Sequence, residues 1–381
     1  MTIQIDGTNC NNKGAELMLF AILQQIEKKC PKATVIINGD IRNYKLSDFS
    51  SSLSLKTTLG SNSFARKYNI IKYLKYLHLP YCWLTFLCPH QGVDVLFDAS
   101  GFCYSDQWNL AEDRCKMMIN YFDKMSKYGT KIFFLPQAWG PFEKEKTNSV
   151  VAKIVEVAEI IFAREHVSFE YFSQIKKSCP NLLISPDFTS LVNCSVPTKY
   201  KHLKDSVCII PNVRMLDKTT TTSEEYMRFW KEIIVFCQKK GKRVFVLNHS
   251  DKSDRLVCNL LAHTYKLECV DYLDALEVKS VISQSYLVIS SRYHGIASAL
   301  NSLVPCLATG WSHKYELLFS DYSQHNNLLN VGDVQGALEK MNYYFNEENR
   351  NASISKMKAQ KEEIQKATQS MWDKIWKKIE I

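Results

Sequence analysis

The sequence lacks the short motifs that identify several large classes of protein. It contains no Cys-x-x-Cys, His-x-x-x-His, Asp-x-Asp or clustered Cys/His pattern, so we expect no metal site and no bound cofactor. It has no RNP, zinc-finger or helix-turn-helix signature, and no Gly-x-Ser-x-Gly elbow of a serine hydrolase. The net charge of +9 is too diffuse to indicate a nucleic-acid partner. It suits an anionic ligand or an anionic membrane surface.

The 13 cysteines lack the form of a disulfide framework. Their number is odd, and several lie inside apolar runs, among them Cys208, Cys237 and Cys306. A chain of 381 residues does not need disulfides, and a free thiol packs as a small hydrophobe. No signal peptide precedes the strand expected at Ile3. We therefore expect a cytoplasmic protein, either free or at the inner face of the membrane.

One stretch, residues 66–88, comes closest to a membrane segment. A spanning helix needs about 20 mostly apolar residues, and Lys72, Lys75 and Pro80 interrupt this one. The mixture of basic and aromatic residues is typical of an interfacial helix. Two interpretations stay open, namely peripheral membrane contact through 66–88 and an amphipathic helix packed on its own domain.

Apolar strands alternate with helical patterns along most of the chain. Strands are expected at 3–6, 35–38, 93–97, 131–135, 159–163, 182–184, 207–210, 243–247, 268–270, 287–290 and 304–309. The polar stretch 193–205 separates two such series. We therefore predict an α/β protein with two doubly wound Rossmann-like domains that face a cleft, as in the GT-B architecture. The predicted parts are a first domain at 1–195, a second at 205–345 and a charged amphipathic helix at 352–381.

Polar residues follow four strands of the second domain. Asn212 and Arg214 follow the first strand, and His249 and Asp254 follow the next. The other two groups are Ser291, Arg292 and His294, and then Ser312, His313 and Lys314. Because parallel strands end at one edge of the sheet, we expect these side chains to converge there.

These residue types favour an anion site that contains a proton carrier. Arg292 and Arg214 can grip a carboxylate or phosphate in bidentate fashion, and the alternative for each is an ordinary salt bridge. Lys314 adds a cation unless it is simply solvated. His294 is the expected proton carrier unless it only caps its own helix. A loop histidine bonded to Asp251 or Asp254 is the alternative for His249.

The first domain offers a Gly/Asn-rich turn at 6–16, between a strand and a helix. Its spacing does not match Gly-x-Gly-x-x-Gly, and no Gly-Lys-Ser/Thr is present. Its amides suit sugar hydroxyls or phosphate equally well. Trp139 can be read as a sugar-stacking platform or as a core tryptophan. The candidate acceptor-binding residues are Asn9, Asn12, Lys13, Asp98, Gln137 and Trp139.

Several short motifs resemble, in the same order, those of bacterial polysaccharide pyruvyl transferases. The resemblance covers most of residues 3–320. It rests on Gly7-x-Asn9 followed by Lys13-Gly14-Ala15-Glu16, Gln137-x-x-Gly140-Pro141, Ala163-Arg164-Glu165-x-x-Ser168, Pro186-Asp187 and Ser291-Arg292-x-His294-Gly295. Two departures are Gly14-Ala15, where many relatives look like Gly-Asp, and Ala99-Ser100-Gly101 in place of a glycine pair.

The resemblance implies a GT-B-like fold and transfer of pyruvate from phosphoenolpyruvate onto two sugar hydroxyls, forming a cyclic ketal. His294 and Arg292 would be catalytic. Arg214, Arg292, Lys314, His249 and Ser291 would bind the donor. The acceptor would be a sugar of a surface polysaccharide, such as a lipid-linked saccharide of capsule or exopolysaccharide synthesis.

Two other functions stay open on the residues alone. A nucleotide-sugar glycosyltransferase of the same fold could use Arg292 and Lys314 for a diphosphate and Glu316 for ribose. A non-catalytic, membrane-associated polysaccharide assembly protein would instead bury Arg292 and His294 in fully paired positions.

Overall fold

The computed structural model describes residues 1–38, 46, 49, 52–57, 92–172, 175, 179–250, 252–310 and 314–381. These residues form two compact units. Unit 1 contains Met1–Cys10, Met18–Thr189 and Ala367–Ile381, and unit 2 contains Asn11–Leu17 and Ser190–Lys366. The stretch 66–88 lies outside the described residues. Within the described ones, every helix is too short or too polar to span a bilayer.

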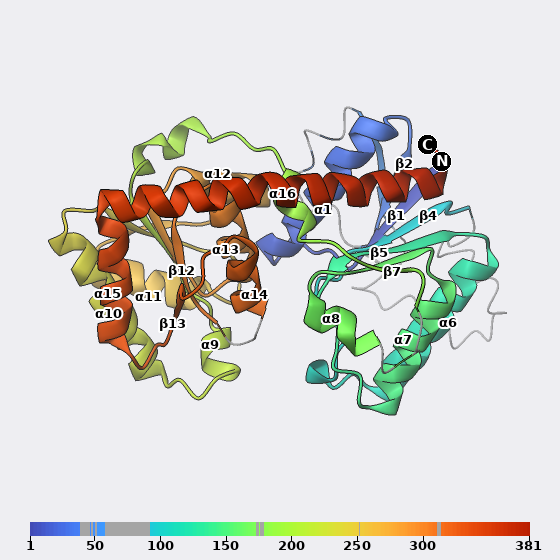
Figure 1. Ribbon diagram of the computed structural model, residues 1–381, viewed down its shortest axis with the longest axis horizontal. Helices are drawn as coiled ribbons and strands as arrows, with labels where there is room; N and C mark the ends of the chain where they lie inside the picture. The colour runs from blue at the N-terminus through green and yellow to red at the C-terminus, as the bar shows by residue number, and fades with distance from the viewer. Residues whose placement is uncertain are drawn as a thin grey trace, which may run out of the picture. The chain divides into compact units, whose positions relative to one another are not determined.

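Unit 1 is built on a seven-stranded parallel sheet in the order β3-β2-β1-β4-β5-β6-β7 (Figure 1). Its strands are β1 Thr2–Asp6, β2 Thr34–Ile37, β3 Ser54–Thr57, β4 Val95–Asp98, β5 Lys131–Gln137, β6 Ile160–Ala163 and β7 Leu182–Ile184. From β1 the chain builds outward through β2 and then returns to place β4 on the other side of β1. The strand order therefore reverses between β1 and β4, where Asp6 pairs with Asp98.

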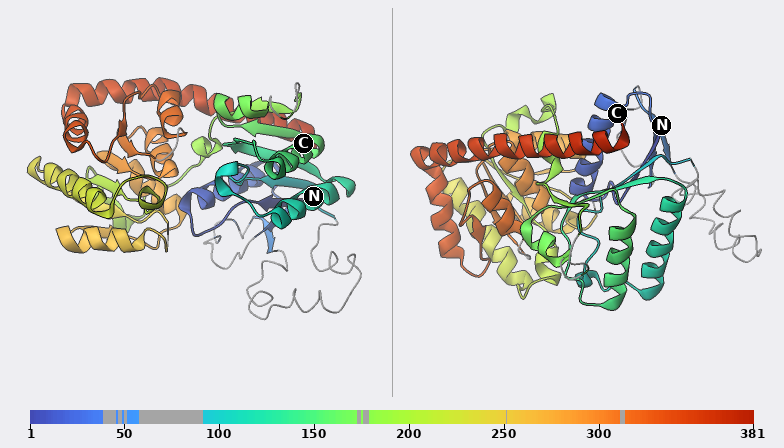
Figure 2. Two further views of the ribbon diagram at one scale, coloured as in Figure 1. Left: turned by 90° about the horizontal axis from the view of Figure 1, so that it is seen from below. Right: turned by 45° about the vertical axis from the view of Figure 1, so that its right-hand side comes forward.

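Helices cover both faces of this sheet because its strands are apolar on both sides. The helices of unit 1 include the main part of α1 Lys13–Lys29, α6 Glu112–Lys127, α7 Glu145–Val157 and α8 His166–Tyr171. α6 and α7 lie side by side and share a core with Leu96 of β4 (Figure 2). Phe97 points to the opposite face, where it contacts Trp372 and Trp376 at the end of the last helix.

Unit 2 is built on a six-stranded parallel sheet in the order β10-β9-β8-β11-β12-β13. Its strands are β8 Val207–Ile210, β9 Val244–Leu247, β10 Glu268–Val270, β11 Leu287–Ser290, β12 Cys306–Thr309 and β13 Leu328–Leu329. β8 lies between β9 and β11, so the strand order of this sheet reverses between β8 and β11.

Two buried clusters fix the helices on the faces of the second sheet (Figure 1). One joins α10 Ser223–Lys239, α11 Arg255–Tyr265 and α15 Val334–Phe345 to the sheet. The other joins α12 Ala275–Ser283, α13 Tyr293–Asn301, α14 Lys314–Asp321 and the first part of α16 Glu347–Ile379 to the opposite face. Short elements complete the description, namely α9 Arg214–Asp217, η3 Asp106–Trp108, η5 Phe188–Leu191 and η6 Thr198–Leu203.

The predicted α/β class with parallel sheets is confirmed, and the differences concern short or polar elements. β3 and β13 were not predicted, because neither has a long apolar run. The last helix begins at Glu347 rather than at 352. The turn segment Asn11–Leu17 and residues from Ser190 onward group with unit 2, whereas the sequence places residues 1–195 in one domain.

Candidate functional site

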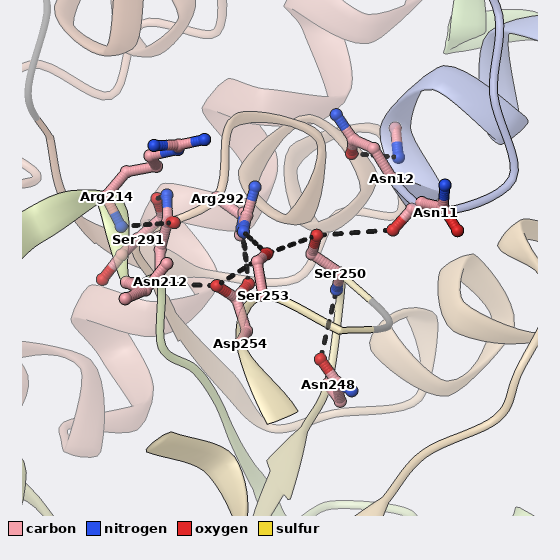
Figure 3. Close-up of polar contacts among 12 residues, drawn as sticks. Asn11, Asn12, Asn212, Arg214, Asn248, Ser250, Ser253, Asp254, Ser291 and Arg292 are labelled. Carbon is pink, nitrogen blue, oxygen red and sulfur yellow. Dashed lines mark hydrogen bonds and ion pairs between the residues drawn. The ribbon is translucent and has the colours of Figure 1, made fainter. Parts of the chain in front are cut away.

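Polar side chains from three loops meet at the carboxyl edge of the second sheet (Figure 3). The loops follow β8, β9 and β11, and they carry Arg214, Asp254 and Arg292 respectively. β8 and β11 flank the point where the strand order reverses, and open α/β sheets bind ligands at that place. The convergence predicted from the sequence is therefore observed for these three strands.

Arg292 is held by a buried carboxylate. Its Nε lies 2.7 Å and its Nη2 2.6 Å from Oδ2 of Asp254, and Nη2 also donates to Oγ of Ser253 at 3.2 Å. The Arg292 side chain is 14% exposed. Among the described residues, none accepts from its Nη1 group. The guanidinium is thus oriented on one side and keeps donor capacity for an anion.

Asp254 was expected among the converging polar residues, but its pairing with Arg292 was not. Its side chain is fully buried, and Oδ1 accepts from the backbone N–H of Val213 at 3.1 Å. A buried carboxylate is stable only when it is paired and hydrogen-bonded. Asp254 therefore ties the β8 and β9 loops to Arg292. Its position after β9 predicted that it lies at this edge, but no local pattern indicated which cation it pairs with.

His249 lies among cations and is almost completely buried. Burial, followed by the nearby charges of Arg292 and His294, holds the pKa of His249 well below its ordinary range. Among the described residues, none forms a hydrogen bond with its Nδ1. A neutral imidazole with a buried nitrogen atom left over is suited to a hydrogen bond with a ligand.

The turn that precedes α1 packs against this same site. The backbone N–H of Lys13 donates to the carbonyl of His249 at 3.3 Å, and Asn12 forms a β-bridge with Ser250. A Cβ placed on Gly14 would lie 2.2 Å from Nδ1 of His294. Only a glycine allows the backbone to approach the imidazole this closely.

Asn12 and Lys13, which the sequence analysis assigned to the acceptor side, therefore lie beside the predicted donor residue His249. The Lys13 ammonium is 3.0 Å from Oε2 of Glu16, and both side chains are buried. The sequence separates this turn from His249 by more than two hundred residues, so spacing could not reveal the contact. Asn9, by contrast, is exposed and belongs to unit 1.

The remaining predicted donor residues take different positions. Arg214 is 47% exposed and pairs with Asp217 in its own short helix. The Ser291 hydroxyl is buried and bonded to Tyr226 and Thr309, so it braces the loops instead of presenting itself to a ligand. Lys314 is partly buried, with Nζ 5.7 Å from the ring centre of Tyr293. Three residues named with these, Asp251, Ser312 and His313, lie outside the described residues.

Trp139 is a core residue, the second of its two interpretations. It is 1% exposed, its ring stacks on Tyr104 at 5.0 Å, and Nε1 donates to the carbonyl of Phe162. No ring face is left for a sugar. Gln137 and Asp98 are also buried, and Nε2 of Gln137 donates to Oδ1 of Asp98 at 3.2 Å.

We expect Gly14→Ala to displace the His294 imidazole and destabilise unit 2. The new methyl group would overlap the ring, and overpacking of this kind costs about 1–3 kcal/mol. The measurement is the melting temperature by differential scanning fluorimetry. Gly332→Ala is the matched control, because its Cβ meets nothing nearer than 3.5 Å. Equal melting temperatures for the two variants would contradict the close contact.

The fold resembles solved structures of sugar-nucleotide enzymes. A putative UDP-N-acetylglucosamine 2-epimerase from Listeria monocytogenes has a TM-score of 0.63 at 12% identity, covering 100% of this chain and 96% of that one. The Neisseria meningitidis UDP-GlcNAc 2-epimerase has a TM-score of 0.61 at 11% identity, covering 99% and 100%. Anabaena HepE in complex with UDP has a TM-score of 0.57 at 12% identity, covering 98% and 99%. At these identities the likeness establishes the GT-B-like fold alone.

Comparison of sequences assigns the chain to a family, whereas comparison of structures gives only its fold. A search of curated proteins found no match. The family model described as polysaccharide pyruvyl transferase matches residues 12–313, which is most of the chain. The matched range contains the Asn12 turn, His249, Asp254, Arg292 and His294. The chain therefore belongs to the polysaccharide pyruvyl transferase family.

Proposed function

We propose that this protein transfers the pyruvyl group of phosphoenolpyruvate onto two hydroxyls of one sugar residue, forming a cyclic ketal. The observation that carries the proposal is the arrangement of Arg292 on buried Asp254, beside His249 and His294, in a chain of this family. Such a site offers cationic and neutral donors to a small anion, in a place shielded from water.

Phosphoenolpyruvate carries a phosphate and a carboxylate, and the site has donors for both. Arg292 can donate to the anion from Nη1, the nitrogen atom that Asp254 and Ser253 leave available. His249 can add a hydrogen bond from its neutral ring, and Lys314 and Arg214 would add charge from the neighbouring loops. Asp254 and Glu16 balance part of the positive charge of Arg292 and Lys13. The two carboxylates therefore reduce the repulsion among the cationic groups of the site.

His294 is the proposed general acid. Transfer of its proton to the methylene carbon would make C2 of phosphoenolpyruvate cationic, and one sugar hydroxyl would attack there. Phosphate would leave, and attack by the second hydroxyl would close the ketal, with both hydroxyl protons released. His249 is less suited to this step, because its low pKa keeps the ring neutral, and a neutral imidazole is a far weaker acid than an imidazolium.

We also propose which molecule accepts the pyruvyl group. A saccharide of a surface polysaccharide, carried on a lipid at the inner face of the membrane, suits the basic and aromatic composition of 66–88. Proteins crystallised with UDP share the fold, so a nucleotide sugar is the ligand class to test against phosphoenolpyruvate.

We expect phosphoenolpyruvate, and not UDP-GlcNAc or UDP-glucose, to raise the melting temperature of the protein. A ligand at a hundred times its dissociation constant stabilises the native state by about 2.7 kcal/mol. Arg292→Lys should abolish the shift because a single ammonium group cannot keep the contact with Asp254 and also donate to the anion from a second nitrogen atom. Arg243→Lys, exposed and paired with Glu268, is the matched control. A shift with the UDP-sugars alone would favour a glycosyltransferase.

We expect His294→Gln to lose turnover far more than donor affinity. Removal of a general acid lowers kcat by about 10²–10⁴-fold. His249→Gln should instead weaken phosphoenolpyruvate binding, and exposed His263→Gln should change neither. Donor affinity is measured by calorimetry, and turnover by phosphate release and mass spectrometry of the product. In D₂O the ketal methyl group should gain one deuterium. Unimpaired turnover by His294→Gln would refute its role.

A further inference from the structure

Helix α11 carries apolar side chains on both of its faces. Cys258 and Leu261 are fully buried in the core of unit 2, where the helix packs on the sheet. Leu256 is 81% and Leu260 is 50% exposed, and their spacing of four residues places them together on the outward face. A surface helix normally keeps polar residues outside, and exposed apolar residues that lie together mark a contact surface.

Tyr272 extends this surface beyond the helix. It follows β10 and is 72% exposed. The guanidinium of Arg255, the first residue of α11, lies 4.5 Å from the centre of the Tyr272 ring. Leu256 and Tyr272 are the two most exposed of the large hydrophobic side chains that the structure describes. We call Leu256, Leu260 and Tyr272 the α11 patch.

The charged groups on and next to α11 leave an excess of positive charge. The helix contains no aspartate or glutamate, and the exposed Lys252 and Lys266 lie close to its two ends. Asp254, directly before the helix, is fully buried within its own ion pair. Asp271 accepts from Nε of Arg255 at 2.8 Å, so its charge is compensated as well. The α11 patch is therefore flanked by basic residues whose charge remains available to a partner.

A hollow of about 270 Å³ lies between α11 and β10, beside the α11 patch. Arg255, Asn259 and Tyr272 are among the residues that line it. Glu268 lines it too, and its carboxylate already binds the guanidinium of Arg243 at 3.0 Å. The hollow is thus polar, with its acids paired, and it adjoins an apolar surface. A phospholipid offers the same combination, because a polar head group adjoins its acyl chains.

Protruding leucines between lysines suit an anionic bilayer better than a protein partner. Cores of protein interfaces are depleted of lysine, because burying an ammonium group costs its hydration. At a bilayer surface the lysines stay hydrated beside the lipid phosphates, while leucine side chains enter the boundary of the acyl chains. The net charge of +9 has the sign that an anionic membrane attracts.

We infer that the α11 patch, with Lys252 and Lys266, is a docking surface for an anionic phospholipid bilayer. Leu256 and Leu260 enter the acyl boundary, and the two lysines contact lipid phosphates. This surface is separate from residues 66–88, and it does not depend on the reaction proposed above. Because α11 begins directly after Asp254, docking here would also bring the proposed donor site towards a lipid-carried acceptor.

The test is co-sedimentation of the full chain with vesicles of phosphatidylglycerol and phosphatidylcholine in equal parts. The wild type should bind these vesicles, should not bind vesicles of phosphatidylcholine alone, and should be released by salt. The double variant Leu256→Ser, Leu260→Ser should bind about tenfold more weakly, because it has no apolar side chains to insert. Met117→Ser, 69% exposed on α6 of unit 1, is the matched control and should bind like the wild type.

A second pair of variants tests the lysines. Lys252→Glu with Lys266→Glu should weaken vesicle binding about tenfold. Lys356→Glu with Lys358→Glu changes the net charge equally, on exposed positions of α16, which packs on the opposite face of the sheet. This control should weaken binding much less. Equal losses in the two double variants would show attraction by net charge alone and would overturn the inference.

Folding and donor binding are measured on the same proteins. The leucine double variant should keep the wild-type melting temperature and the wild-type shift with phosphoenolpyruvate, because both side chains are exposed. A wild type that does not respond to phosphoenolpyruvate would contradict the proposed function alone. No vesicle binding by the wild type, or undiminished binding by the leucine double variant, would overturn the docking surface. A wild-type dimer in analytical ultracentrifugation that the leucine double variant loses would do so as well, because a second copy would then cover the patch.

Discussion

The proposed donor site depends on one buried ion pair, that of Asp254 with Arg292. Asp254 has no exposed surface, so its charge must be compensated inside the protein, and Arg292 is the only basic group bonded to it in the described part of the chain. Removing one member of such a pair costs about 3–5 kcal/mol, because the other charge is left uncompensated. The pair therefore fixes the guanidinium where β8, β9 and β11 end. After burial, the charge of Arg292 is the next cause of the lowered pKa of His249.

The two sheets use the same structural position for opposite chemistry. Where the strand order reverses in unit 2, the loops supply a cation and two imidazoles. At the corresponding position in unit 1 they supply two carboxylates and two amides. The cationic groups of unit 2 suit an anionic ligand.

The sequence predicted the parts of this arrangement that follow from strand periodicity. Arg292 and His249 were placed correctly at the carboxyl edge because buried parallel strands are recognisable, and polar residues after them must share that edge. Asp254 was not recognised as a partner of Arg292, nor was the contact of Gly14 with His294. Both contacts join segments remote in sequence, and no local pattern encodes them. The sequence allowed two interpretations of Trp139, because only the packing around an indole shows whether it faces a ligand or the core.

The central claim is that Asp254 positions Arg292 for phosphoenolpyruvate, and a double-mutant cycle tests it most directly. Calorimetry would give the phosphoenolpyruvate dissociation constant for the wild type, Asp254→Asn, Arg292→Lys and the double variant. The account predicts that each single variant weakens binding and that the double variant is little worse than Arg292→Lys, with a coupling of about 1–3 kcal/mol. Additive effects, or unchanged affinity in Asp254→Asn, would contradict it.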